Sequence, residues 1–430
     1  MILYHATSFG RTKRSQRSVA RAGAALQRAT EWLQAQGLPA QGLPAHGLQA
    51  QGTQAQGTPA HGLPAQELHA SNGPAGLVLT GPAAVAWASG GVAPLVDRAA
   101  HVDLVWVVIS PAGAGLITTQ VEADRVRDEY DPARHGFGEL AEVPWHQPEG
   151  FVAAAESLAG APAARLASDG HPAFGIDASA DLTALRLALS PAEQADLADL
   201  GADAAEALQS ALTQWRPGER DLDIQARCAA FLEAQGADAP VLIVGGDDRL
   251  ERYRHPMAVG APVDRLVMAV VVARRAGLHA AATRFAASAP LDPGFAALRR
   301  RVLAIEDAVL SACVPGGSYG AALDALDAAY ARAGAPGGWS GHYQGGPIGF
   351  AQREFEIAPG QRGSRWYAEP VRAGHAVAWN PSLPGGAKSE DTYLVADDGV
   401  HQRVTISPGW PMEPDDTMRP PRPTVLEVGT

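Results

Sequence analysis

Apolar residues follow two different spacings along the chain, and their distribution predicts a first domain at about residues 15–180. Helical spacing is found at Ser18–Gln36 and again at Val121–Tyr130. Short apolar runs typical of strands lie between and after them, at Gly76–Thr80, His101–Ser110 and Gly115–Gln120. The second run contains VDLVWVVIS, which is almost continuously apolar and therefore typical of a strand covered on both faces. These elements predict an α/β domain.

A second domain is predicted at about residues 188–415. Ser190, Pro191 and Glu193 form a strong helix start, because serine caps the first turn, proline suits the first helical position and glutamate completes a capping box. Further strands and alanine-rich helices follow at Pro240–Val244, Leu266–Val272, Phe295–Cys313, Tyr319–Ala333, Ala376–Val395 and Arg403–Ile406. We therefore expect a mixed α/β (α+β) protein with two domains.

Three segments fall outside these domains. Residues 1–14 are basic and predict a tail, and residues 416–430 are rich in proline and predict another. Between about residues 33 and 70 a pentapeptide repeats in the form LPAQG, with glycine or proline in each unit and almost no charge. Such a segment buries too little apolar surface to offset the entropy of ordering it. We interpret it as a disordered insertion in the first domain.

Composition limits the classes of partner. The chain has 430 residues, 46% of them hydrophobic, and a formal net charge of -12. An acidic chain is not expected to bind nucleic acid or an anionic membrane, and no apolar run is long enough to span a bilayer. The two cysteines, Cys228 and Cys313, lie in apolar helix-like surroundings and are expected to be buried thiols. We expect a cytoplasmic protein.

Polar residues that could form a site are concentrated in three segments. RYRHP contains His255, GHYQGGPIGFAQRE (341–354) contains His342, Arg353 and Glu354, and AWNPSLPGGAKSEDTYLV (378–395) contains Asn380, Lys388 and Glu390. Plainer interpretations stay open: His255 as a structural turn residue, Arg353 and Glu354 as a solvated ion pair, and Glu390 as an ordinary carboxylate at a strand end. The Asn380 amide caps a turn or donates to a substrate carbonyl.

The last two segments resemble the active-site segments of the aminopeptidase P, prolidase and creatinase family. The resemblance implies a creatinase-like N-terminal domain, a catalytic domain with the pita-bread fold, and hydrolysis of an Xaa-Pro or related amide bond. In metal-dependent members the first segment reads roughly His-x-x-x-His-x-x-Gly, and the second supplies two glutamates. Here His342 matches the first histidine, Gly346 the second, Asn380 the first glutamate and Glu390 the second.

Two aspartate ligands in this family come from a β-hairpin. The frame of that hairpin matches through Asp264, Gly277, Thr283 and Arg284, which places the aspartate positions near Val270 and Ala281. No acidic residue lies between Asp264 and Asp292 in any register. Four of the five ligand positions therefore lack a suitable side chain. Although the family precedent is two Mn, Co or Zn ions, we expect no metal cofactor here.

The resemblance leaves two functional hypotheses. In the first, His255, His342 and Glu390 act in a metal-free amidohydrolase, with Glu390 orienting one imidazole, while Arg353, Glu354, Asn380 and Lys388 bind the substrate. Creatinase is the family's precedent for a metal-free member. Its hairpin glutamate, however, falls on Ala282 or Thr283 here. In the second hypothesis, the chain binds a peptide or small amide without turning it over. A homodimer is compatible with both.

Overall fold

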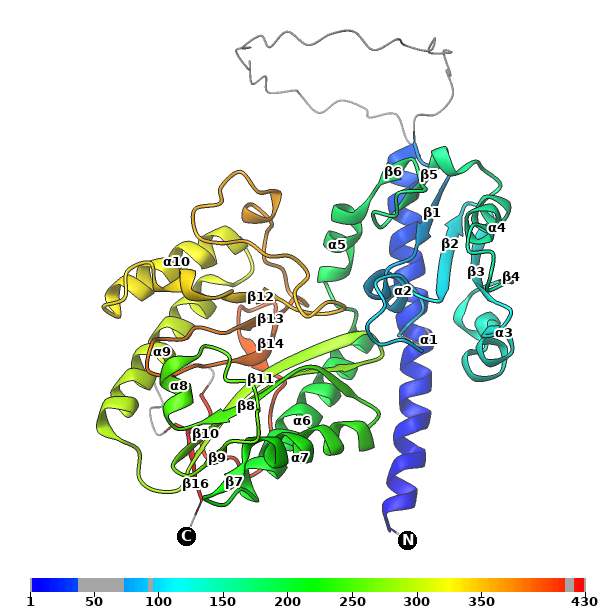
Figure 1. The fold of residues 1–430 in the computed structure, drawn as a ribbon. Coiled ribbons are helices and arrows are strands. Elements are labelled where there is room, and N and C mark those ends of the chain that lie inside the picture. Colours follow the sequence, from blue (N-terminus) through cyan, green and yellow to red (C-terminus); the bar gives the residue numbers. More distant parts are fainter. Residues whose placement is uncertain (1, 38–72, 92–95, 414–420, 429–430) are drawn as a thin grey trace, which may run out of the picture.

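The computed structural model describes residues 2–37, 73–91, 96–413 and 421–428. The pentapeptide repeat lies outside the described residues, apart from residues 33–37. Those residues close the long first helix, α1 (Ile2–Gly37). The described chain forms two parts, and α1 runs along the N-terminal one and also contacts α6 of the C-terminal one (Figure 1).

A six-stranded sheet forms the centre of the N-terminal part. Its strands occur in the order β4-β3-β2-β1-β5-β6. All six residues of β2 are buried, which confirms that this strand is covered on both faces. On one face Val107 packs in a cluster with α1 and α2, and on the other face Val108 packs with Phe151 of α4. The bounds are β1 (Gly76–Leu79), α2 (Pro82–Ala88), β2 (Val105–Ser110), β3 (Gly113–Thr119), β4 (Glu139–Val143), α4 (Gly150–Ala159), β5 (Leu166–Ser168) and β6 (Ile176–Asp177).

Two local predictions in this part are corrected. Helix α1 begins at Ile2 rather than Ser18, so residues 2–14 belong to a helix and not to a separate tail. Arg17 of α1, one position before the expected start, lies with its Nε 2.7 Å from Asp196 of α6, and this contact favours helix at that position. The helix expected at Val121–Tyr130 is short, with α3 (Ala123–Arg125) followed by a π-helical turn, η1 (Val126–Tyr130).

The C-terminal part begins after α5 (Ser179–Leu187) with the predicted helix start. The Ser190 side chain accepts from the Glu193 N–H while the Glu193 carboxylate accepts from the Ser190 N–H, so the capping box is confirmed. Helices α6 and α7 pack against the sheet β16-β11-β10-β8. The bounds are α6 (Pro191–Thr213), β7 (Glu219–Arg220), α7 (Asp221–Ala234), β8 (Asp238–Gly246), α8 (Asp248–Arg252), β9 (Pro262–Val263), β10 (Leu266–Arg275) and β11 (Leu278–Ala287).

A second sheet, β12-β13-β14-β15, carries the segments with the candidate site residues. Helices α9 and α10 pack on it through an apolar cluster that includes Val309, Leu326 and Trp379. Strand β15 ends at Arg403, so the strand expected at Arg403–Ile406 lies mostly earlier in the chain. The bounds are α9 (Pro293–Ala312), α10 (Tyr319–Arg332), β12 (Gly345–Pro347), β13 (Ala376–Trp379), β14 (Asp391–Val395) and β15 (His401–Arg403).

The C-terminal segment is not a free tail over residues 421–428. Strand β16 (Leu426–Glu427) pairs in parallel with β11, and the Arg422 side chain is fully buried against Glu306 of α9 with Nε and Oε2 2.7 Å apart. A buried carboxylate requires such a partner, which explains why this proline-rich segment is held in place.

Three further expectations bear on the whole chain. The mixed α/β (α+β) class is confirmed. Both Cys228 and Cys313 are buried free thiols, as predicted. Within the described ranges, no helix is long and apolar enough to cross a membrane.

Candidate functional site

Glu390, which immediately precedes β14, forms an ion pair inside the protein. It is buried, and its Oε2 lies 2.8 Å from the Lys388 ammonium and accepts a hydrogen bond of 2.9 Å from the Thr283 hydroxyl. The Asn380 amide points toward Oε1 at 3.4 Å. Residues predicted as separate site members, Glu390, Lys388 and Asn380, are therefore one buried polar group.

The hairpin of β10 and β11 faces this group with apolar side chains. Val270 pairs with Thr283 across the hairpin, and Val272 pairs with Ala281, so Val270, Ala281 and Thr283 share one face. Val270 and Ala281 are 3% and 2% exposed. These are the positions at which the resemblance places two aspartates. An alkyl side chain cannot coordinate a cation, and only the Thr283 hydroxyl reaches Glu390.

The donor set does not fit a pair of divalent ions. Gly346 of β12 has no side chain, and Asn380 offers one amide in place of a carboxylate. Glu390 Oε2 already contacts the Lys388 ammonium at 2.8 Å, so a metal at that oxygen would have to displace it. Among the residues that the structure describes, no three His, Cys, Asp or Glu side chains gather in a way that could hold a metal ion. The residues present are suited to an ion pair with the Lys388 side chain rather than to the coordination of two metal ions.

The two predicted histidines, His255 and His342, lie side by side although 87 positions separate them in the chain. Their ring centroids are 6.5 Å apart, with the planes at 71°. His342 is fixed from both sides, because Nδ1 faces the Tyr343 carbonyl and Nε2 lies 2.6 Å from the Ser382 hydroxyl. Glu390 was expected to orient one imidazole. Instead, the Tyr343 carbonyl orients His342, while Glu390 Oε2 is engaged by Lys388 and Thr283 and Oε1 faces the Asn380 amide.

The environment keeps both imidazoles uncharged at neutral pH. Burial, followed by the nearby cations Lys388 and Arg254, lowers the pKa of His342 to about 4. The pKa of His255 is also lowered, first by burial and then by Lys388, although Glu390 opposes this. A neutral imidazole can accept a proton, which is the state that a general base requires.

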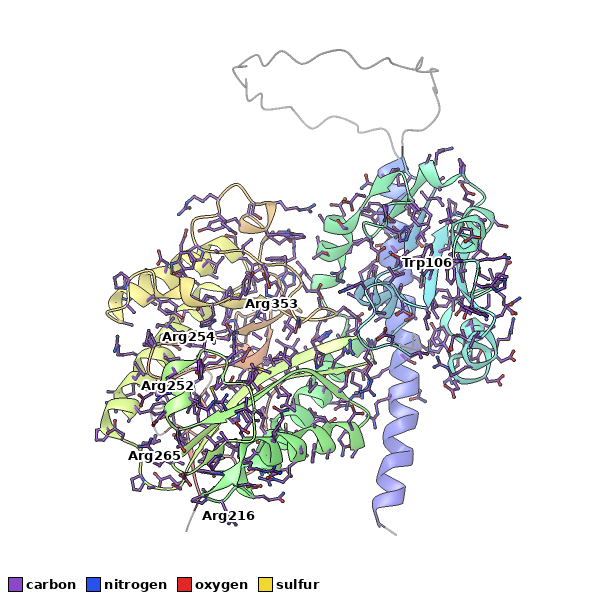
Figure 2. All side chains as sticks on the ribbon, viewed as in Figure 1. Trp106, Arg216, Arg252, Arg254, Arg265 and Arg353 are labelled. Atoms are coloured by element: carbon purple, nitrogen blue, oxygen red, sulfur yellow. The ribbon has the colours of Figure 1, made fainter. Side chains whose placement is uncertain are left out.

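Two separate hollows lie at the predicted residues. His255 and Arg353 line a groove of about 780 Å³ that follows β8. Lys388 lines a smaller cavity of about 200 Å³ together with Arg254 and Ser382. Arg254 and Arg353, labelled in Figure 2, both belong to the C-terminal part. The predicted residues are thus near each other but do not face one common space.

The other two predicted substrate-binding residues, Glu354 and Arg353, also have protein partners. The Glu354 carboxylate is buried, lies 2.6 Å from Arg186 of α5 and accepts from the backbone N–H of Phe350 at 2.7 Å. The expectation that Glu354 faces a ligand is therefore wrong, because tertiary contacts with α5 engage the carboxylate. Arg353 lies 2.6 Å from Glu356 and stacks over the Tyr343 ring, but it still lines the groove.

Sequence reasoning missed Ser382 and Arg254. Arg254 Nη1 donates to the Ser382 hydroxyl at 2.8 Å, beside the contact of that hydroxyl with His342. The Ser382 backbone N–H donates to the Tyr330 hydroxyl, which in turn donates to Gln344. A single serine in a proline turn has no sequence pattern that marks it. The only available signal was that Arg254 adjoins His255 and that Ser382 lies two positions after Asn380.

Comparisons with known proteins identify the fold. Residues 197–397 match the model of metallopeptidase family M24. No curated protein sequence matches the chain. Dipeptidase PepE from Mycobacterium ulcerans is similar in structure, with a TM-score of 0.63, 20% identity, and coverage of 83% of this chain and 94% of that one. These likenesses confirm the predicted pita-bread fold.

Two other solved structures belong to different functional classes. Prolidase from Pyrococcus furiosus has a TM-score of 0.60 at 16% identity, with 77% of this chain and 96% of that one covered. The N-terminal domain of the FACT complex subunit SPT16 from Cicer arietinum has a TM-score of 0.57 at 13% identity, with 77% and 91% covered. The fold is thus shared by a prolidase and by a domain of a complex subunit, so the fold does not decide the activity.

Proposed function

We propose that this chain, which belongs to metallopeptidase family M24, hydrolyses a peptide or small amide at a C–N bond without a metal pair. The observation that carries the proposal is the buried ion pair of Lys388 and Glu390, 2.8 Å apart, at the place where the family resemblance expects a bridging carboxylate. A metal bound to Glu390 would have to displace this ammonium. The apolar Val270 and Ala281 would give it no further ligands.

The two imidazoles supply the acid–base chemistry in this proposal. Their centroids are 6.5 Å apart, so an amide group lying alongside the pair would be within reach of both rings. Because each pKa is lowered, each ring begins as a base and becomes an acid only after it takes up a proton. Arg353 at the groove and Asn380 beside Glu390 are the proposed substrate contacts. The buried free thiols support a reducing compartment such as the cytoplasm.

Metal content and turnover test the proposal together. The purified full chain should contain well under one transition metal ion per molecule, and hydrolysis of a panel of Xaa-Pro dipeptides and small amides should persist in a chelator. His255→Ala and His342→Ala should each lower the rate by about 10² or more, whereas His146→Ala, an exposed histidine of the N-terminal part, should not. Two metal ions per chain, or complete inhibition by the chelator, would contradict the proposal.

The second candidate function is binding without turnover, and the free edge of β8 favours it. Strand β8 pairs with β10 only, so among the described residues its other edge has no partner strand. The groove of about 780 Å³ follows this edge and is walled by Met257 and Arg353. An extended peptide could add to such an edge through backbone hydrogen bonds. A peptide that binds the purified chain, loses affinity in Arg353→Ala and is recovered uncleaved would favour this function.

A further inference from the structure

We propose that Ser382 is a catalytic nucleophile activated by His342, so that the chain cleaves small amides through a covalent acyl-enzyme. This inference rests on the proposed function, since it gives the metal-free hydrolysis its attacking atom. It adds a residue, Ser382, and a reaction class, acyl transfer, that neither the sequence motifs nor the family resemblance contains.

Hydrogen bonds define the direction of proton transfer between the two side chains. A carbonyl oxygen can only accept, so the proton of neutral His342 lies on Nδ1, which faces the Tyr343 carbonyl. Nε2 then carries the lone pair and accepts from the Ser382 hydroxyl at 2.6 Å. A nucleophile, a base within 2.6–3.2 Å and a third group that orients the base are the arrangement expected of an activated serine. Here a backbone carbonyl takes the orienting position.

Arg254 adds a positive charge at the same oxygen. Its Nη1 donates to the Ser382 hydroxyl at 2.8 Å, and within the described ranges no carboxylate lies within ion-pair distance of this guanidinium. A cation without an acidic partner stabilises negative charge that develops on or next to that oxygen. The hydroxyl can accept from Arg254 and donate to His342 at once, because it has one proton and two lone pairs. The three side chains therefore form one series of hydrogen bonds, in which Arg254 donates to Ser382 and Ser382 donates to His342.

The surrounding cavity indicates a small acyl group. Ser382, Arg254 and Lys388 line a cavity of about 200 Å³, which is smaller than the pockets of about 300 Å³ or more that hold drug-sized ligands. Its other walls include Leu250, Met268 and the turn Pro384–Ala387. Its charged lining residues are Arg254, Lys388, Arg252 and Glu251. We therefore assign to it the acyl portion of an amide or ester of a few non-hydrogen atoms, with the carbonyl oxygen toward the cations.

The reaction balances without an added co-reactant besides water. Ser382 Oγ attacks the carbonyl carbon, its proton passes to His342 Nε2, and the carbonyl electrons move to the oxygen near Arg254. The C–N bond then breaks and the proton on Nε2 passes to the departing amine, leaving an ester on Ser382. Water attacks the ester, giving a proton to Nε2, and the C–O bond breaks as Ser382 recovers that proton.

A covalent probe tests the nucleophile separately from metal content and turnover. We would incubate the full chain with a biotinylated fluorophosphonate and map the modified residue by mass spectrometry. We expect a single adduct on Ser382. Ser382→Ala should abolish labelling, and His342→Ala should slow it by about 10² or more. Ser340→Ala, which removes an exposed hydroxyl two residues before His342, should label like the unchanged chain.

The outcomes separate this inference from the proposed function. If the chain lacks metal and Ser382→Ala still hydrolyses the substrate at the original rate, the serine nucleophile is wrong while metal-free hydrolysis stands. If two metal ions are found, the proposed function fails first. Should Ser382→Ala not fold, Ser382→Cys keeps the shape, and iodoacetamide should modify it faster than it modifies the buried Cys228 and Cys313. Equal rates at the three thiols would overturn the inference.

Discussion

Lys388 and Glu390 show how a single residue changes the chemistry that a shared fold can support. Buried carboxylates need positive charge nearby, and a metal centre provides it through ions. In this chain Lys388 provides it through its own ammonium, 2.8 Å from Glu390, with both side chains less than a tenth exposed. The pair stabilises a strand end that would otherwise bury a charge among Val270 and Ala281.

The residue-scale prediction concerns this pair. Lys388→Met should lower the free energy of unfolding by about 3–5 kcal/mol, because it leaves Glu390 buried without a counter-charge. Lys388→Met combined with Glu390→Gln removes both charges at similar volume and should recover most of the loss. Urea unfolding followed by circular dichroism measures both. If the single variant matched the unchanged chain, Glu390 would not be charged in the folded state.

At the scale of elements, the C-terminal segment supports the strand that carries the site. The Glu306 carboxylate on α9 accepts from Arg422 at 2.7 Å and from the Ser389 hydroxyl at 2.7 Å. Ser389 lies between Lys388 and Glu390. The contacts of Glu306 with Ser389 and Arg422 therefore connect this part of the chain to α9 and to residues 421–428. Arg284 on β11 adds a second buried ion pair, with Asp391 at 2.7 Å.

This arrangement makes the C-terminal segment necessary for stability. Arg422→Ala should cost about 3–5 kcal/mol, because Glu306 loses its buried cation. Arg300→Ala is the matched control, since Arg300 is exposed on the same helix as Glu306, and it should change stability by less than about 0.5 kcal/mol. Chemical denaturation of the two variants makes the comparison. Equal effects would mean that the Arg422 contact contributes little.

At the scale of the whole molecule, buried histidines couple stability to pH. The pKa values of His279, His342 and His375 are each lowered to about 4, first by burial. Nearby cations lower them further: Arg274 at His279, Lys388 and Arg254 at His342, and Arg372 at His375. Asp238 opposes the shift at His279, and the backbone carbonyls of Gly349 and Tyr343 oppose it at His279 and His342. The folded chain therefore resists protonation that the unfolded chain accepts.

The lowered pKa values of these histidines make the stability of the folded chain depend on pH. Between about pH 6.5 and pH 4 the unfolded chain binds protons that these histidines refuse in the folded state, so stability should fall as pH falls through this window. Asp103, whose pKa burial raises to about 6, acts in the opposite direction and offsets part of the loss. Urea midpoints at pH 7.5, 6 and 5 measure the trend. His279→Asn should reduce the slope by up to about one proton. Unchanged midpoints would show that the imidazoles are protonated when folded.

The repeat gives a second prediction at this scale. Deleting residues 38–67 should change the free energy of unfolding by less than about 1 kcal/mol, because the segment has few apolar side chains and shortening a long loop has a small entropic effect. Thermal and urea unfolding of the shortened chain would measure this. A cooperative loss of several kcal/mol would instead mean that the repeat packs on the domain.

The sequence by itself determined several of the elements and the frame of the site. Local patterns are sufficient for these features: the apolar run of β2, the capping box at Ser190, and the absence of any acid between Asp264 and Asp292. Periodicity and capping act within a few residues, so they can be recognised from neighbours in the chain.

Only the tertiary structure decided which polar groups meet. His342 and Ser382 are 40 positions apart, and Arg186 and Glu354 are 168 apart, yet both pairs lie within 2.6 Å. No local pattern fixes such distances, because they depend on how β12, β13 and α5 pack. That packing places the Glu354 carboxylate against Arg186 and the Ser382 hydroxyl against His342. In this way it decides which side chains remain available for chemistry.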